Sequence, residues 1–208
     1  AHARLLSVNT SKAEALPGVK AVVTSKDFPI ISGPLNFDNG SRIMAENMLA
    51  TEKVLYKGHA IAAVAATDAH IAEEAIGLID VKYDVLEPVL TVHDALKEGA
   101  PVLHEGLTTV FKVERFGKGE DTGVKSNIAS HIQFKRGDLD KGFKDADLVI
   151  EREFNTQTVH QGYIEPHSST ASWSYDGRLT VWTSTQGIFG IRDATAAILG
   201  IQASQVKV

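Results

Sequence analysis

Apolar residues along this chain follow two spacings, a period of two that is typical of strands and a period near 3.6 that is typical of helices. Residues 5–9 and 19–24 have the strand pattern on either side of a short helical stretch. Ser11 and Glu14 have the spacing of a capping box at the start of that helix, and Pro17-Gly18 is placed to end it. The first unit is therefore predicted to be strand, helix, strand.

A second unit of the same kind follows a long irregular stretch. Residues 28–50 show little periodicity and contain Gly, Pro and Asn, so we predict a long loop, a kind of segment that is usually functional. Residues 59–66 form an apolar strand pattern, and Asp68 is a good N-cap. Residues 71–79 present one apolar helical face, and residues 81–85 are predicted to be the return strand.

The first half of the chain ends with a short helix predicted over residues 92–98 and a strand over residues 101–104. Two strand–helix–strand units predict an α+β fold of mixed α/β character. We assign residues 1–105 to a first domain. Residues 106–127, rich in glycine and charge and without a sustained period, are predicted to be a linker or exposed crossover. Residues 128–208 form the second half.

The second half opens with a strand pattern over residues 128–136. Asp138 is placed to cap a helix over residues 139–145. Leu148, Ile150 and Phe154 then fall on one side of a period of two, which predicts a further strand.

A polar loop and a hairpin precede the last helix. The loop is HQGYIEPH at residues 160–167, and Asp176-Gly177 predicts a hairpin with a primed turn between two strands. The second strand continues into Ser184-Thr185-Gln186, a helical pattern follows over residues 188–198, and Gly200 is placed to stop it. A polar side chain at such a strand-to-helix step lies beside free backbone N–H groups, where anionic cofactors bind.

Composition narrows the class of protein. A chain of 208 residues that is 43% hydrophobic can bury a sizeable core. Its net charge of −5 gives no indication of nucleic-acid binding, and the absence of cysteine excludes disulfides and thiolate ligation of metals or iron–sulfur clusters within the chain. No apolar run reaches the length of a membrane span and no signal peptide is recognisable, so we expect a cytoplasmic protein.

The pairing of HQGYIEPH with LTVWTSTQGIFGIRDATAAILGI at residues 179–201 resembles the molybdenum-cofactor subunit of the xanthine dehydrogenase and aldehyde oxidase family. That family also includes carbon monoxide dehydrogenases and 4-hydroxybenzoyl-CoA reductases. The resemblance continues through GDLDKGFKDADLVIEREF at residues 137–154 and through residues 3–29. It implies an α/β-hammerhead domain over residues 1–105, followed by the incomplete first part of a molybdopterin-binding α+β domain over residues 128–208.

The resemblance also implies roles for single residues. Gln186 matches the glutamine that hydrogen-bonds to an oxo ligand of the molybdenum centre, and Gly187 and Phe189 would belong to the same cofactor-binding segment. Glu165 and His167 match the family's segment near the substrate approach. From the residues alone, other roles stay open: Gln186 is also placed to satisfy backbone groups at a strand end, and Gly187 also suits a turn.

The function implied by the resemblance is that of a molybdenum hydroxylase, in which a molybdenum-bound hydroxide hydroxylates an aldehyde or an N-heterocycle oxidatively. The glutamate base of this family is expected beyond Val208, so no catalytic residue is assigned within the chain. The expected partners are the remainder of the molybdenum-binding subunit and the subunits or domains that carry [2Fe–2S] clusters and FAD. The complete enzyme is expected to be an oligomer, and the chain alone, which has strand patterns at both ends and looks like a fragment, is expected to be inactive.

Two other functions are compatible with the sequence. One is a hammerhead-type interaction module without catalytic activity. The other is a metal-dependent hydrolase that uses His160, Glu165 and His167. The spacing of these three residues differs from the helical i, i+4 histidine pair of zinc hydrolases, and loop histidines that bond to backbone are the plainer interpretation.

Overall fold

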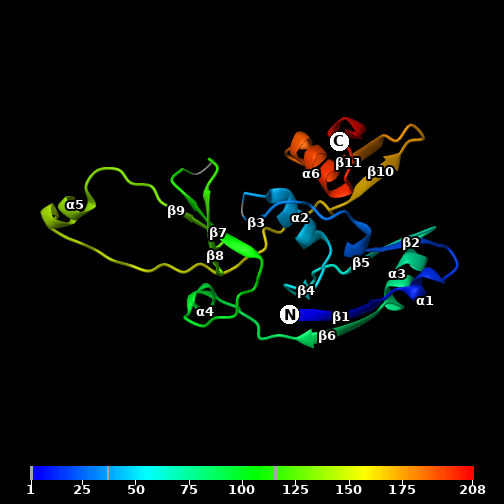
Figure 1. Ribbon diagram of the computed structural model, residues 1–208, viewed down its shortest axis with the longest axis horizontal. Coiled ribbons are helices and arrows are strands. Elements are labelled where there is room, and N and C mark those ends of the chain that lie inside the picture. The colour runs from blue at the N-terminus through cyan, green and yellow to red at the C-terminus, as the bar shows by residue number, and fades with distance from the viewer. Residues whose placement is uncertain (1, 37, 115–116) are drawn as a thin grey trace.

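The computed structural model describes residues 2–36, 38–114 and 117–208 (Figure 1). Helices and strands are mixed along the chain, as the sequence predicts. The figure shows helix α2 beside the C-terminal sheet and helix α6, while α5 lies far from the other elements at the end of two extended segments. In the described ranges, no helix combines the length and the apolarity that crossing a membrane requires.

The first half contains two small antiparallel sheets. Strand β1 lies between β4 and β6, and β2 pairs with β5. These strands are β1 (Ala3–Asn9), β2 (Val19–Thr24), β4 (Lys53–Val54), β5 (Ala62–Ala66) and β6 (Asp80–Val85). The two predicted strand–helix–strand units are therefore confirmed, with each unit contributing one strand to each sheet.

Two helices cover these sheets, α1 (Ser11–Glu14) and α3 (Ala69–Gly77). Their alanines Ala13 and Ala75 are fully buried. Asp68 caps α3 as predicted, because its Oδ1 accepts the Ile71 N–H at 3.0 Å. Gly18 is required where the two helices meet: its φ is +97°, and a Cβ there would lie 2.6 Å from the Ile71 Cδ1 atom.

Two local predictions in the first half are wrong. The capping box of Ser11 does not form, because Thr10 is the N-cap and the Ser11 N–H donates to Asn9 Oδ1 at 3.1 Å. The stretch predicted as a loop contains β3 (Leu35–Asn36) and α2 (Gly40–Met48). The Asn39 side chain starts α2 by accepting the Arg42 N–H.

The elements at the end of the first half are shorter than predicted. Helix α4 (Val92–Leu96) forms, with its Asp94 N–H donating to Thr91 Oγ1 at 3.0 Å. The strand predicted over residues 101–104 does not form. Asn127 holds this stretch instead, since its side chain accepts the Leu103 N–H and donates to the Pro101 carbonyl oxygen, both at 2.9 Å. These bonds satisfy backbone groups that a strand would pair.

The stretch predicted to be a linker contains strands in the part that the structure describes; residues 115 and 116 lie outside the described residues. Strand β7 (Leu107–Lys112) pairs with β3, β8 (Glu120–Lys125) and β9 (Ser130–Ile132). The pattern was missed because β7 is buried on both faces, so its apolar residues do not alternate: Leu107 is 8% exposed on one face and Val110 is 1% exposed on the other. The division into domains at residues 106–127 stays a prediction.

Hydrogen bonds between two buried polar residues, Asn36 and Lys112, and two exposed carboxylates hold this third sheet together. Lys112 donates to Asp38, whose second oxygen accepts the Gly119 N–H at 2.7 Å. Asp121 Oδ2 accepts from the Asn36 amide at 2.9 Å and from the Thr108 hydroxyl at 2.8 Å. Charge-assisted hydrogen bonds of this kind fix the segment before α2 against β7 and β8.

Between β9 and β10 the chain is extended and exposed. Only α5 (Leu139–Asp145) forms there, capped by Asp138 as predicted, with the Lys141 N–H donating to Asp138 Oδ1 at 3.0 Å. The strand predicted from Leu148, Ile150 and Phe154 is absent, and Phe154 is 86% exposed. No neighbouring strand in the described residues offers this apolar stretch a partner, and a strand needs one. The strand predicted over residues 128–136 is reduced to β9 for the same reason.

The C-terminal unit is a small sheet of order β10-β11-β12 covered by α6. Its elements are β10 (Ser169–Trp173), β11 (Leu179–Thr183), α6 (Ile188–Leu199), η2 (Ala203–Gln205) and β12 (Val206–Lys207). Leu179, Ala196 and Val206 form its core. The predicted hairpin is confirmed but its turn is not primed, since only glycines have positive φ in the described residues and Asp176 precedes a left-handed Gly177.

Asp38 provides a test of the third sheet. Lys112, first, and the Gly119 N–H hold the pKa of Asp38 below its ordinary 3.8, so the carboxylate stabilises the folded state above pH 3.8. This contribution disappears as the pH falls through the lower folded-state pKa. We expect Asp38→Asn to lower the melting temperature at pH 7 and to lose this effect toward pH 3. Asp84→Asn, at an exposed position on β6, is the control, and an equal decrease at both pH values would contradict the assignment.

Candidate functional site

The candidate site is the step from strand β11 to helix α6. Ser184, Thr185, Gln186 and Gly187 connect the two elements, and all four are exposed. The Gly187 N–H donates to Thr185 Oγ1 at 3.1 Å. Helix α6 has no side-chain N-cap bond and no acidic residue in its first turn. The first turn of α6 therefore presents N–H donors without a neighbouring carboxylate of its own helix.

The polar loop at residues 160–167 reaches this junction. The Ser184 hydroxyl donates to Glu165 Oε1 at 2.6 Å, which joins two segments that are 19 residues apart in the chain. The distance is typical of a strong bond from a hydroxyl to a carboxylate. Glu165 and Gln186 thus belong to one neighbourhood, an arrangement that the sequence pattern alone did not establish.

The other predicted residues of the loop do not converge on a metal site. The Tyr163 ring packs against His160 and His167, with ring centroids 5.0 and 4.7 Å apart. His160 Nδ1 accepts the Gly162 N–H at 3.0 Å. Within residues 2–36, 38–114 and 117–208, no three or more His, Cys, Asp or Glu side chains are arranged to hold a metal ion. The His167 ring stacks on Tyr163 and the His160 ring is tilted against it, so this geometry gives no support to the hydrolase hypothesis.

Phe189 and Gly187 are open to the surroundings. Phe189 is 67% exposed, and the Arg192 guanidinium carbon lies 5.3 Å from the centre of its ring. A Cβ at Gly187 or at Gly190 would meet no atom of the described chain within 4 Å. Neither glycine is required by packing here, and both leave room for another molecule to approach the backbone closely.

The donors at the junction indicate the kind of ligand that it suits. The junction carries the Gln186 carboxamide and the N–H groups at the start of α6, while the Ser184 hydroxyl donates to Glu165 and the Gly187 N–H donates to Thr185 Oγ1. Neutral donors beside a helix N-terminus favour an anionic group or an electron-rich oxygen. A molybdenum cofactor with an anionic pterin fits this donor set. Gln186 and the first N–H groups of α6 are the groups that would hold it.

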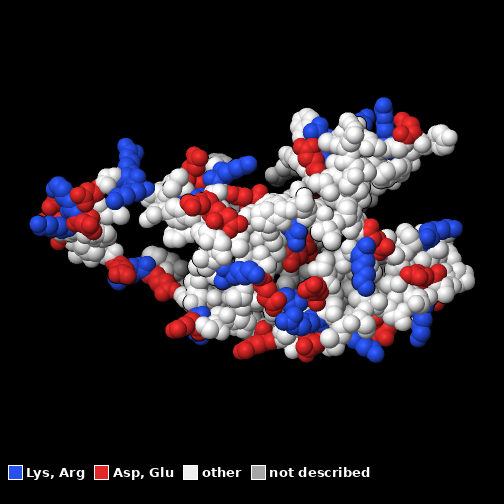
Figure 2. Space-filling view, in the orientation of Figure 1, with Lys and Arg blue, Asp and Glu red and all other residues white. Residues whose placement is uncertain are grey.

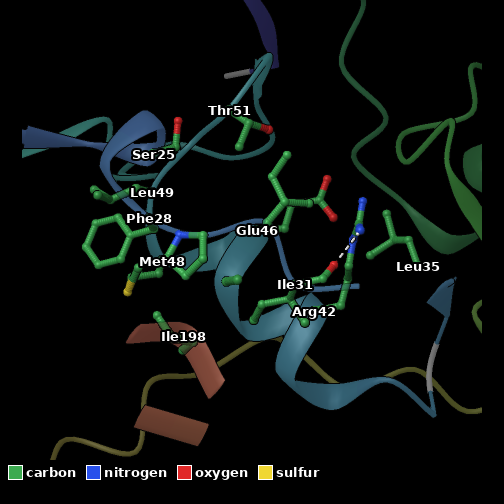
Figure 3. Close-up of a pocket in the computed structure, with 13 residues that line it drawn as sticks. Ser25, Phe28, Ile31, Leu35, Arg42, Glu46, Met48, Leu49, Thr51 and Ile198 are labelled. Atoms are coloured by element: carbon green, nitrogen blue, oxygen red, sulfur yellow. Dashed lines mark hydrogen bonds between the residues drawn. The ribbon is translucent and has the colours of Figure 1, made fainter. Parts of the chain in front are cut away.

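A cavity that sequence reasoning missed lies between α2 and the C-terminal end of α6 (Figure 3). Its volume is about 160 Å³. Its walls are mainly apolar and come from both halves of the chain, including Phe28, Met48, Leu49 and Ile198. This cavity could not be predicted from the sequence, because the stretch that contains α2 is predicted to be a loop.

Charged side chains of both signs are exposed on the surface of the molecule. Figure 2 shows acidic and basic side chains interspersed over the face that it presents. The densest group of charges on that face lies around α5, where both signs occur. A nucleic-acid surface would instead concentrate lysine and arginine.

Comparisons with known families divide the chain in two. Residues 1–87 match the aldehyde oxidase and xanthine dehydrogenase a/b hammerhead domain. Residues 121–208 match the molybdopterin cofactor-binding domain. The two matches follow the order that the resemblance implies, with residues 88–120 between them.

Several curated relatives match the whole chain. A protein named probable hypoxanthine oxidase, from Escherichia coli (strain K12), is 34% identical, and the match covers 24% of its length. The large molybdopterin subunit of nicotinate dehydrogenase from Eubacterium barkeri is 33% identical, with 43% of its length covered. The chain therefore spans between a quarter and a half of these relatives.

A solved structure has the same fold. The Cu,Mo-CO dehydrogenase in its carbon monoxide reduced state superposes with a TM-score of 0.73 at 30% sequence identity. The match covers 99% of this chain and 25% of that chain.

The bond between Ser184 and Glu165 is open to a direct test. We expect Ser184→Ala to release the loop and to increase chymotrypsin cleavage after Tyr163 about 2- to 12-fold, the range given by the loss of a typical net hydrogen bond. Ser169→Ala is a matched control, because it removes a 2.7 Å bond to Thr183 Oγ1 in the same sheet without touching the loop. Equal cleavage rates in the two variants would show that Ser184 does not hold the loop.

Proposed function

This chain belongs to the xanthine dehydrogenase and aldehyde oxidase family, and we propose that it supplies part of the molybdenum-cofactor site of a hydroxylase of that family. The observation that carries the proposal is the meeting of the 160–167 loop with the β11–α6 junction through Ser184 and Glu165. These are the two segments whose pairing resembles the family. Their contact is a property of the folded chain and is independent of the sequence comparison.

Gln186 is proposed to donate a hydrogen bond from its carboxamide to an oxygen ligand of the metal. A neutral amide suits this position because it stabilises electron density on oxygen without adding charge. The first N–H groups of α6, with Gly187 leaving the backbone accessible, are proposed to face the anionic part of the cofactor. Phe189 is exposed beside them and is proposed to contact the same group.

Glu165 and His167 are proposed to lie on the side from which the substrate approaches. Ser184 fixes Glu165, and the Tyr163 ring stacks on His167, so both side chains have defined positions. When bound, the molybdenum cofactor supplies the oxidising centre that accepts two electrons from the substrate carbon. No residue of this chain is assigned as the base, which is expected in the part of the family's subunit that corresponds to positions after Val208.

The proposed reaction is oxidative hydroxylation of an aldehyde or an N-heterocycle. In balanced form, substrate R–H and water give R–OH, two protons and two electrons. The names of two relatives, a hypoxanthine oxidase and a nicotinate dehydrogenase, favour an N-heterocycle. We propose that the electrons leave through [2Fe–2S] clusters and FAD on other subunits or domains, which agrees with a chain that has no cysteine.

A non-catalytic interaction module remains the second candidate, because α5 and the segment after it expose apolar side chains such as Phe143, Leu148 and Ile150. We expect a partner to cover such a surface whether the chain is part of a hydroxylase or an interaction module. The content of molybdenum separates the two functions, since an interaction module has no reason to retain the metal when it is part of the complete protein.

The chain by itself should not retain the cofactor. A cofactor held by several domains loses most of its contacts when only these residues are present. Micromolar affinity corresponds to a binding free energy of only about 8 kcal/mol, and the lost contacts are expected to contribute more than that. We expect the 208-residue chain, purified from molybdenum-replete cells, to contain far less than one molybdenum per chain by elemental mass spectrometry. Stoichiometric molybdenum would contradict this prediction.

Gln186→Ala in the complete enzyme tests the proposed site. We expect the rate of substrate-dependent reduction of the enzyme to fall roughly 10- to 1,000-fold, by analogy with the loss of one oxyanion-hole donor, which costs about 100- to 1,000-fold. The melting temperature should change little, because Gln186 is exposed at the boundary of two elements.

Two further variants make this measurement specific. Gln186→Glu keeps the shape of the side chain but removes the N–H donor, and it should lose activity in the same way. Gln157→Ala changes the same residue type in the exposed segment before β10 and should retain the wild-type rate. An unchanged rate in Gln186→Ala, at normal molybdenum content, would show that Gln186 only terminates the strand.

A further inference from the structure

Helix α6 contacts two different parts of the molecule near its C-terminal end. Ala196 and Leu199 pack against the sheet β10-β11-β12, within the cluster formed around Leu179 and Val206. Ile198 instead lines the cavity between α6 and α2. The same turn of helix therefore joins the C-terminal sheet to the first half of the chain.

The residue that ends α6 also lies against the first half. Gly200 has φ +68°, and the Ile201 N–H donates to the Ala196 carbonyl oxygen at 3.0 Å, a bond that closes helices ending in a left-handed glycine. A Cβ at Gly200 would lie 3.2 Å from Pro29 Cγ. Pro29 thus lies so close to the helix end that a side chain at residue 200 would crowd it.

Met48 forms the wall of the cavity on the α2 side. Figure 3 shows its side chain beside Phe28 and near Ile198, and all three line the cavity. Methionine adapts to irregular spaces because it is unbranched, so it can maintain contact across an interface that is not fully packed. The cavity of about 160 Å³ leaves room for α6 to move if this wall is shortened.

The N-terminal end of α6, in contrast, has few contacts within the described chain. Residues 184–190, which include Gln186, are all exposed. Since α6 has 12 residues, its two ends are about 18 Å apart. A tilt of about 5° at the C-terminal end would move the N-terminal end by about 1.5 Å at that helix length. A displacement of that size is enough to reduce a reaction rate about a hundredfold when it affects a group at the reacting centre.

We propose that Met48, together with Pro29 and Ile198, positions Gln186 by fixing the C-terminal end of α6 against the first half of the chain. Met48 is a positioning residue that touches neither substrate nor cofactor. The inference rests on the proposed function of Gln186 and adds to it the role of the first half, which holds α6 at the correct angle. The cavity is the place where that angle is set.

The test uses Met48→Ala in the complete enzyme, with Met44→Ala as the matched control. Met44 is the same residue type on the same helix, is 53% exposed and does not line the cavity. We expect Met48→Ala to lower kcat and kcat/KM together by about tenfold or more, the pattern for loss of an interaction made in the transition state. Met44→Ala should stay within about twofold of the wild type, and Met48→Leu should restore most of the rate because it conserves volume.

A second measurement does not depend on activity. Hydrogen exchange of the backbone amides at residues 191–194, the first that are hydrogen-bonded within α6, should become faster in Met48→Ala and stay unchanged in Met44→Ala, because the helix start is released only when its far end is loosened. The double variant Met48→Ala/Gln186→Ala should be no slower than Gln186→Ala alone, since Met48 acts through Gln186. If Met48→Ala does not accumulate in folded form, Pro29→Ala replaces it.

Unchanged exchange at residues 191–194 in Met48→Ala would overturn the proposal, as would rate losses that multiply in the double variant. If Gln186→Ala itself retains the wild-type rate, the proposed function of Gln186 fails. In that case the exchange measurement alone decides whether Met48 controls the start of α6. The two failures are therefore distinguishable.

Discussion

Helix α6 is the element on which the arrangement of the molecule depends, because it packs on two surfaces at once. Ala196 is small enough to let the helix lie close to Leu179 and Val206 of the C-terminal sheet. Ile198, two residues later, points to the cavity wall formed by α2. Neighbouring positions on a helix differ by about 100°, so one turn can serve both surfaces. Without α6, the described contacts between the C-terminal sheet and the first half would be few.

The other side of this contact depends on polar groups rather than on apolar packing. Helix α2 follows β3, and β3 is held to β7 and β8 by Asn36, Asp121 and the Asp38–Lys112 pair. A nearly buried lysine lowers stability unless a carboxylate and further acceptors compensate its charge. This network therefore fixes the position of α2, and α2 in turn limits how α6 can lie. The α6 helix start at Gln186 is thus connected to groups far away in the sequence.

Local signals in the sequence predicted those elements whose ends are defined by a few neighbouring residues. Asp68 and Asp138 cap helices as expected, and Gly200 ends α6 in the left-handed conformation. One local signal was wrong, since Thr10 and not Ser11 is the N-cap of α1. The other predictions failed where the deciding contact is distant. Strand β7 is buried on both faces and shows no alternation, while Leu148 and Ile150 alternate but have no strand beside them. Periodicity reports what a segment can bury, and only the rest of the fold determines whether it does so.

The same limit applies to the site. The family resemblance selected Gln186 and Glu165, but the sequence could not establish that they are neighbours. The loop and the strand end are joined by a single hydrogen bond from Ser184 to Glu165, which are 19 residues apart in the chain. The histidines next to Glu165 show the opposite case. These residue types raised the hypothesis of a metal site although their spacing differs from that of zinc hydrolases, and in the structure the Tyr163 ring lies against both imidazole rings. The positions of functional groups on a loop are determined by the side chains that restrain the loop. Ser184 and Tyr163, which the sequence analysis did not single out as site residues, are therefore as informative about this site as Gln186 itself.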